Sequence, residues 1–346
     1  MDTALATAEW QRFTQLHWGL DPVRLAYAPR GPGGPRLDAI FYADRRGRLR
    51  LPPYQPHLPL RFVPTATDAS YRVERQWLET ARLLVDDMLD RGTWSELTFS
   101  HELVDPRPWR WASFRVTPHF TNLIDLPFTW SQADRVARQQ ASKAERAGLT
   151  CGLTGDLDAV MACLAGSQRR KGVAYGMDRP GLELARRLLG PDALRLYLCT
   201  TATGEPATAR VILHRAGGRG LDWMAGTRDE WLKSGATQLL LAHVLEDLHR
   251  AGASGYDSCG ADLEPVAHTK LLWGGTLAAQ YAIQGYDWRS SRQLLGGWLR
   301  FVRRRSALRR ARRLAGAEGA RAPAAATPDA IAPAPSGFAK RGGDAP

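Results

Sequence analysis

The segment that most constrains the fold is a strongly periodic helix followed by glycine residues. Apolar side chains recur at three- and four-residue steps over residues 237–250, which predicts a helix with one buried stripe. Gly252 then ends the helix, and the short run 254–258 follows. That run suits a strand whose last residues face a cleft. This order predicts an open α/β sheet with a ligand site at the carboxyl end of the strand.

The loop before this helix has the composition expected of a phosphate site. Residues 220–226 predict a strand, and the following loop leads into the helix. Backbone N–H groups are free at a helix start, and basic side chains nearby add positive charge. The predicted cofactor-binding residues are therefore Arg228, Lys233, Ser234, Gly235, Ala236 and Thr237. An ordinary surface loop with a small-residue helix cap explains the same sequence, so both interpretations stay open.

Length and composition set limits on the class of protein. With 346 residues and 44% hydrophobic content, the chain is long enough for two domains. Its 4 cysteines are scattered without a C-x-x-C pair, which favours reduced thiols over a zinc site. No apolar run approaches the roughly 20 residues of a membrane span, and the N-terminus has no signal-peptide pattern. A cytoplasmic protein without a metal site is expected.

The net charge of +12 is concentrated at the C-terminus. Residues 289–346 contain thirteen basic and three acidic residues, which leaves 34 basic against 32 acidic residues before them. Residues 292–314 mix apolar side chains with arginines, as a helix on an anionic membrane surface does. A solvated basic tail or an RNA-binding arm would have the same charge. Residues 316–346 are rich in Ala, Pro and Gly, which predicts disorder.

Two α/β halves with mixed sheets are predicted before this tail. The first, residues 1–130, contains a predicted hairpin, a periodic helix and two further strands, at 38–52, 71–92, 94–100 and 120–126. The second, residues 131–288, begins with a charged helix and two further helices. Three antiparallel strands follow at 193–201, 204–216 and 220–226, and then the helix and strand described above. Residues 289–315 are assigned to the basic helix.

Four sequence elements resemble the FemAB-like branch of the acyltransferases, also described as the BioF2-like acetyltransferase domain. They are RQQASKAERAG, RLYLCTTATGEPATARVIL, the helix start SGATQLLL, and YDSCG followed by HTKLLWGG. The resemblance implies tandem lobes of the N-acetyltransferase (GNAT) type. The first lobe would be degenerate, the second catalytic, and the cleft would lie between them.

The resemblance also suggests residues for the site. Asp257 matches the D-x-x-G strand end of the family, and Lys270 matches the lysine of its later F-K-x-x-F-G-G element. Thr269 and Trp273 stand in place of the two Phe residues. An ammonium at Lys270 could neutralise an oxyanion or a donor phosphate, and Asp257 could orient the acceptor amine or accept its proton. A turn-capping Asp257 and a surface Lys270 are the structural alternatives.

Three residues are candidates for binding the acceptor. They are Trp273, whose ring would act as an aromatic wedge, and Arg170 and Tyr175 in the polar stretch before residue 179. Cys259 could be a nucleophile with His268 as its base, but a small buried thiol is the preferred interpretation.

The resemblance implies an acyltransferase. It would move an acyl or aminoacyl group from a coenzyme A thioester or a charged tRNA to an amine or hydroxyl. The acceptor would be a small-molecule or lipid-linked precursor of the cell envelope or of a polysaccharide. The near-neutral charge of residues 1–288 favours coenzyme A over tRNA. Residues 292–314 could hold the enzyme at the inner face of the membrane. A catalytically silent GNAT-like scaffold in envelope assembly is the alternative, and an RNA-binding protein, based on the tail alone, is the third hypothesis.

Overall fold

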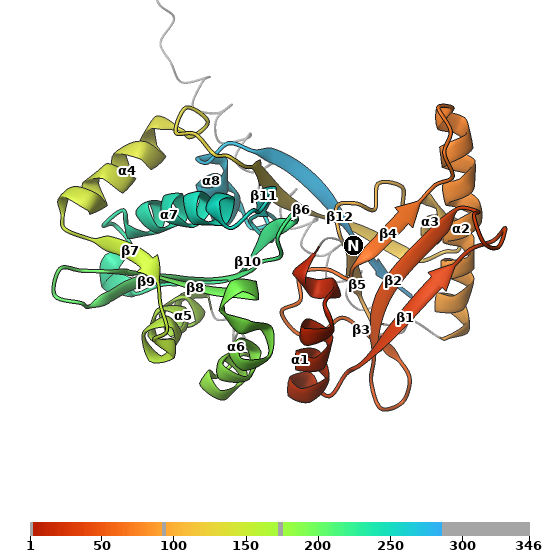
Figure 1. Ribbon diagram of the computed structural model, residues 1–346, viewed down its shortest axis with the longest axis horizontal. Helices are drawn as coiled ribbons and strands as arrows, with labels where there is room; N and C mark the ends of the chain where they lie inside the picture. Colours follow the sequence, from red (N-terminus) through yellow and green to blue (C-terminus); the bar gives the residue numbers. More distant parts are fainter. Residues whose placement is uncertain (1–2, 92–94, 172–175, 286–346) are drawn as a thin grey trace, which may run out of the picture. The chain divides into compact units, whose positions relative to one another are not determined.

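The computed structural model describes residues 3–91, 95–171 and 176–285 (Figure 1). The chain divides after Tyr286, and all of the described residues belong to the first unit, Met1–Tyr286. The predictions for the basic helix and for the tail lie outside the described residues, as does Tyr175. Within the described part of the chain, no helix is both long and apolar enough to span a bilayer.

A four-stranded antiparallel sheet forms the first part of the first unit (Figure 1). Its strands are β1 (Asp21–Tyr27), β2 (Arg36–Ala43), β3 (Leu49–Arg50) and β4 (Leu60–Val63), and β2 pairs with the other three. The predicted hairpin is confirmed as β2 and β3. The predicted periodic helix is α2 (Ser70–Asp90), which packs its buried stripe, including Trp77 and Leu84, against β1 and β2.

An eight-stranded sheet forms the rest of the unit, in the order β5-β12-β6-β11-β10-β9-β8-β7. The strands are β5 (Leu97–Phe99), β6 (Arg115–Asp125), β7 (Thr150–Leu153), β8 (Leu194–Thr200), β9 (Pro206–Leu213), β10 (Arg219–Thr227), β11 (Gly255–Asp257) and β12 (Thr276–Gln284). Neighbouring strands are antiparallel except β10 and β11, which are parallel. The α/β fold class with mixed sheets is therefore confirmed.

Helices cover both faces of the large sheet (Figure 1). α4 (Arg135–Arg146) and α7 (Ala236–Arg250) bury one apolar cluster with it, and α5 (Leu157–Lys171) and α6 (Arg179–Ala193) bury another on the opposite face. The shorter or peripheral elements are η1 (Ala4–Ala6), α1 (Ala8–Trp18), α3 (Arg107–Trp111), η2 (Asp229–Trp231) and α8 (Glu264–Leu271). The predicted order of three strands, helix, strand and helix is confirmed as β8 to β10, α7, β11 and α8.

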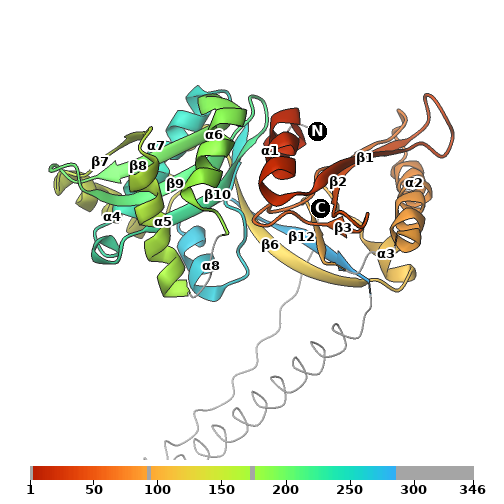
Figure 2. The same cartoon turned by 90° about the horizontal axis from the view of Figure 1, so that it is seen from below.

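Three features differ from the sequence expectation. β5 and β6 come from the predicted first half but pair within the large sheet, so a division at residue 130 does not separate the two sheets. Residues 107–111, which lie between the strands expected at 94–100 and 120–126, form α3, a helix that was not predicted. β12 was not predicted. It pairs with β6 over nine residue pairs and with β5 on its other side, and β6 and β12 run together toward α3 (Figure 2). Long-range pairing, rather than local sequence, determines these strands.

The start of α7 packs directly under α4. Gly235 has a φ of 86°, and a Cβ built there would lie 2.0 Å from the carbonyl oxygen of Gln140 in α4. Lys143 of α4 also donates to the carbonyl of Lys233, at 2.9 Å. Gly252, after the other end of α7, has a φ of 81°, but a Cβ added there would meet nothing within 4 Å.

We expect Gly235→Ala to lower the free energy of unfolding by about 2–5 kcal/mol, because left-handed strain adds to a backbone clash. Gly252→Ala is the matched control. It introduces the left-handed backbone strain without a steric clash, so it should lower the free energy of unfolding by only about 1–2 kcal/mol. Chemical denaturation of both variants measures the difference. Equal losses would mean that α4 moves aside without cost.

Candidate functional site

β10 and β11 separate within the large sheet. They pair only from Arg219↔Gly255 to Leu221↔Asp257, while β10 continues to Thr227. After Asp257 the chain stays with β6, because the N–H of Ser258 donates to the carbonyl of Asn122 at 3.0 Å. A cavity of about 510 Å³ opens where the strands part, and we call it the strand-split cavity. Its walls come from β9, β10, α5, α7, α8 and the loop after β11.

A buried charge pair lies in the wall of the strand-split cavity. Arg210 of β9, 9% exposed, donates to Oδ2 of Asp222 of β10, and also to the hydroxyl of Tyr256 at 3.0 Å. Burial opposes the charge of Arg210, but the neighbouring Asp222 keeps the pKa of the guanidinium above its usual value. Oδ1 of Asp222 has no hydrogen-bond partner among the described residues. This buried oxygen belongs to a residue that lines the cavity, so it can accept a hydrogen bond from a ligand.

Lys270 of α8 also lines the strand-split cavity. Its Nζ donates to the carbonyls of Ser258, at 2.5 Å, and Gly260. Burial lowers the pKa of Lys270, although Asp222 and other nearby groups partly oppose this. Asn122 fixes the end of α8 and the turn after it, because its amide donates to the carbonyls of Lys270, at 3.3 Å, and Gly274, at 2.9 Å. Two of the three ammonium donors hold the loop after β11.

Asp257, predicted as a catalytic partner of Lys270, is placed differently. Its side chain is fully buried and does not line the strand-split cavity. Oδ1 accepts hydrogen bonds from the hydroxyl of Thr121 and, at 2.9 Å, from the N–H of Cys259. This is the geometry of an aspartate that caps a turn, the structural alternative considered for Asp257 in the sequence. The preceding residue of β11, Tyr256, lines the strand-split cavity, and successive side chains of a strand point to opposite faces, so the carboxylate of Asp257 lies on the other side of the sheet.

The predicted phosphate cradle is only partly available. Arg228 pairs with Glu205, at 3.0 Å, and with Glu230. Ser234 caps the N–H of Ala236, and Lys233 is exposed. Ala236 is fully buried and Gly235 packs under α4. Of the six residues predicted here, Thr237 is the one that lines the strand-split cavity.

The other predicted contacts meet at the same cavity. Arg170 lines it, where its guanidinium donates to the carbonyl of Thr227 at 2.8 Å and pairs with Asp229. Trp273 lines it as well, is 3% exposed, and packs its ring 5.6 Å from Phe128. Arg170, Thr237, Lys270 and Trp273 are thus brought together from three parts of the sequence, since Lys270 and Trp273 are neighbours at the end of α8.

The sequence interpretation missed Arg210, Asp222 and Tyr256. The available signal was a charge inside each of two apolar strands, in PATARVIL and GLDWMAG. Cys259 lines the cavity, and burial raises its pKa well above the usual value, so the thiol stays protonated. His268, considered as its base, is exposed and does not line the cavity.

A second cavity lies next to Asp257, on the side of the small sheet. It has a volume of about 190 Å³, and its lining includes His57, Ser100, His101 and Asp257. We call it the histidine cavity. Burial lowers the pKa of His57 to about 4, partly opposed by the carboxylate of Asp257.

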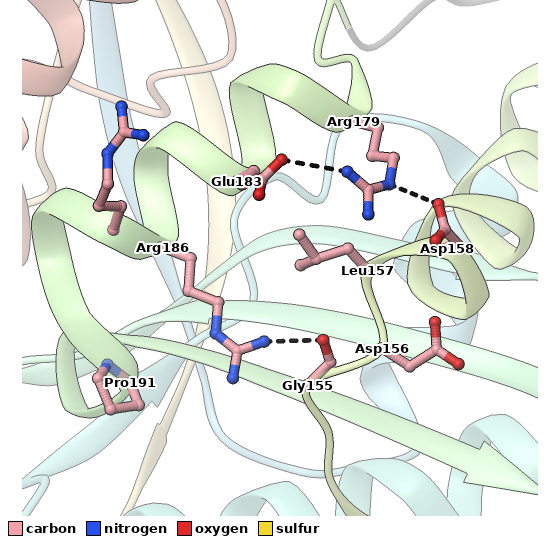
Figure 3. Close-up of a pocket in the computed structure, with 9 residues that line it drawn as sticks. Gly155, Asp156, Leu157, Asp158, Arg179, Glu183, Arg186 and Pro191 are labelled. Carbon is pink, nitrogen blue, oxygen red and sulfur yellow. Dashed lines mark hydrogen bonds and ion pairs between the residues drawn. The ribbon is translucent and has the colours of Figure 1, made fainter.

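A third, surface groove of about 580 Å³ lies between the start of α5 and α6 (Figure 3). Figure 3 shows that Arg179 donates to Asp158, at 2.6 Å, and to Glu183, and that Arg186 donates to the carbonyl of Gly155. Because these side chains already have partners, the strand-split cavity is the better candidate for chemistry.

The fold and the parted parallel strands are those of a GNAT-type domain. Residues 131–265 match the acetyltransferase (GNAT) domain family. Among solved structures, FemX covers 80% of this chain and 91% of its own, with a TM-score of 0.54 at 12% identity. The predicted resemblance to a GNAT domain is confirmed for residues 131–265, and the fold of the chain is similar to that of FemX.

Two further structures have a lower similarity. The C-terminal domain of a putative lysylphosphatidylglycerol synthetase from Agrobacterium fabrum has a TM-score of 0.48 at 14% identity, covering 83% of this chain and 89% of its own. A GCN5-related N-acetyltransferase from Kribbella flavida has a TM-score of 0.45 at 12% identity, covering 83% and 98%. No curated protein matches the sequence.

The low pKa of His57 predicts a loss of stability in mild acid. An unfolded histidine has a pKa near 6.5, so between about pH 6.5 and 4 the unfolded chain binds more protons than the folded one. The free energy of unfolding should fall across this window by up to about 3 kcal/mol. His57→Gln should flatten this part of the pH profile, measured by denaturation at several pH values. The control is the exposed His268→Gln, and equal slopes for both variants would contradict the assignment.

Proposed function

We propose that this chain is a GNAT-type acyltransferase. It moves an acyl or aminoacyl group onto an amine or hydroxyl of a cell-envelope or polysaccharide precursor, and the reaction takes place in the strand-split cavity. The observation that carries the proposal is the buried, unpartnered Oδ1 of Asp222 on the same cavity as Lys270, where β10 and β11 part. Asp222, which can accept a proton, and Lys270, which can donate a hydrogen bond to an oxyanion, then line the same cavity.

Asp222 would bind the attacking group. An amine or hydroxyl can donate to Oδ1 while Arg210 holds Oδ2. When the nucleophile attacks the acyl carbon, the new C–N or C–O bond makes its proton strongly acidic, so an ordinary carboxylate suffices to accept it. The pair with Arg210 fixes the carboxylate in one orientation, which favours transfer over a freely rotating side chain.

Lys270 would stabilise the oxyanion and protonate the leaving group. Its two hydrogen bonds to carbonyls leave one N–H for the cavity. As the tetrahedral intermediate collapses, the bond to the donor sulfur or oxygen breaks and the leaving atom needs a proton. Burial lowers the pKa of Lys270 but raises that of Tyr256 well above its usual value. Lys270 is therefore the better proton donor of the two.

A coenzyme A thioester is the proposed donor, with an aminoacyl-tRNA as the alternative. Met224, Leu241 and Val266 give the cavity an apolar wall for an extended thioester arm, and Thr237 adds a hydroxyl and the first turn of α7. This part of the site fits the donor. The phosphates of the donor would have to bind Lys233, or Arg228 after its ion pairs with Glu205 and Glu230 break, because α4 covers the backbone at Gly235. The part of the site that would bind the phosphates is therefore more obstructed than the part that would bind the acyl group.

The acceptor class rests on the FemAB-like resemblance. A lipid-linked acceptor would be consistent with the basic residues 292–314 acting at an anionic membrane surface, with the protein at the inner face of the membrane. The alternative of a scaffold without chemistry has the disadvantage that it leaves the buried carboxylate of Asp222 without a role.

The test of catalysis is Asp222→Asn in the full chain. This variant keeps the shape but removes the proton acceptor, so kcat should fall roughly 10²–10⁴-fold. Release of free thiol from acetyl-coenzyme A with a panel of amines and alcohols measures the rate. Asp158→Asn, in the groove of Figure 3, is the matched control and should keep full activity. Equal activity of the two variants would remove Asp222 from the mechanism.

The donor is tested with Thr237→Val. Loss of a hydroxyl next to the thioester arm should raise KM for the donor roughly 5–10-fold with kcat unchanged. Thr203→Val, in an exposed turn, is the control. No thiol release with any acceptor, but transfer from charged tRNA, would establish the alternative donor. Failure of both donors would favour the scaffold.

A further inference from the structure

The histidine cavity contains an unusual set of unsatisfied polar atoms. Nδ1 of His57, Oγ of Ser100, Nδ1 of His101 and Oδ2 of Asp257 have no hydrogen-bond partner among the described residues. All four residues line the cavity. His57 and Ser100 are each 4% exposed, and Asp257 is fully buried. Buried polar atoms are rarely left without partners, so their concentration around one space indicates a ligand.

The charges around the cavity select the kind of ligand. Asp257 is buried beside it, and Glu102 is exposed at its edge. The one guanidinium in its lining, that of Arg219, already donates to Asp125, at 2.6 Å, and to the carbonyl of Ile124. The cavity therefore carries an excess of negative charge, which favours a cation over a phosphate or a carboxylate.

The donor set decides between cations. No group of three metal-ligating side chains is arranged around a common point within the described ranges. A primary ammonium, in contrast, has three N–H donors and no acceptor. Asp257, Ser100 and His57 offer a carboxylate oxygen, a hydroxyl oxygen and an imidazole nitrogen. Because burial lowers the pKa of His57 to about 4, its ring is neutral at pH 7 and can accept.

We propose that the histidine cavity binds a primary ammonium group on a short alkyl chain, held by Oδ2 of Asp257, Oγ of Ser100 and Nδ1 of His57. The volume of about 190 Å³ accepts such a group together with a few waters, which take ~30 Å³ each. This site is separate from the strand-split cavity and does not depend on acyl transfer.

Asp257 links the proposed site to the strand-split cavity. Its other oxygen holds the N–H of Cys259, and the flanking carbonyls of Ser258 and Gly260 hold Lys270. An ammonium at Oδ2 would neutralise Asp257 and reduce its field at Lys270, for which Asp257 raises the pKa. A bound amine would thus lower the pKa of Lys270, the candidate catalytic lysine.

Calorimetric titration of the full chain with ethylammonium chloride tests the proposal without any acyl donor. Tetramethylammonium chloride at the same ionic strength is the reference, because it carries the charge but no N–H. We expect a saturable heat for ethylammonium alone. If neither salt gave a saturable heat, the proposal would be wrong and the cavity would hold only water. If both salts bound equally, recognition through N–H donors would be wrong.

Three variants locate the binding. Asp257→Asn removes the anionic acceptor and should abolish the heat, and Ser100→Ala removes one acceptor and should weaken binding roughly tenfold. Ser100→Ala deletes a single atom, so it keeps the test decisive if Asp257→Asn is unfolded by circular dichroism. Asp222→Asn should bind as the parent chain does. Loss of binding in Asp222→Asn, with Ser100→Ala unchanged, would place the amine in the strand-split cavity and refute the proposal.

Discussion

The separation of β10 from β11 after Leu221↔Asp257 is the constraint on which the site depends. β11 lies between β6 and β10, and a Cβ at Gly255 would approach the carbonyl of Ile124 to 2.8 Å, so only a glycine fits there. Beyond Asp257 the chain can follow only one neighbour, and it follows β6. The strand-split cavity is the space that this choice leaves beside β10. Helices α7 and α8 then close it with Thr237 and Lys270.

The buried pair of Arg210 and Asp222 is difficult to explain by stability. Removing two charges from water costs more than their attraction returns, unless every remaining polar atom is satisfied. Oδ1 of Asp222 is not satisfied within the described part of the chain. An apolar pair at the same positions would fold at least as well. The arrangement is therefore better explained by a ligand that completes the hydrogen bonds, and an acceptor amine or hydroxyl does so.

The sequence predicted most of the elements and four of the residues that line the strand-split cavity, Arg170, Thr237, Lys270 and Trp273. The 3.6-residue period identified α7, and the helix carrying Lys270 followed from a family motif. Arg210 and Asp222 escaped because they belong to different strands, and only the register of β9 against β10 brings them together. The surroundings of Asp257 were not predicted, because successive side chains of a strand point to opposite faces: in β11, Tyr256 lines the strand-split cavity and Asp257 lines the histidine cavity. β12, with alanines in TLAAQYAIQ, has weak strand propensity and depends on β6.

Asp257 connects the two cavities through its two oxygens. Oδ1 is fixed by Thr121 and the N–H of Cys259, so it sets the conformation of the loop that holds Lys270. Oδ2 is left toward the histidine cavity. A carboxylate that only capped a turn would need one oxygen, and asparagine or serine would serve there. A charge at this buried position costs free energy, and the cost is understandable if the second oxygen has a cationic partner. The position that the sequence marked as catalytic then acts on the chemistry indirectly, through the loop and the field at Lys270.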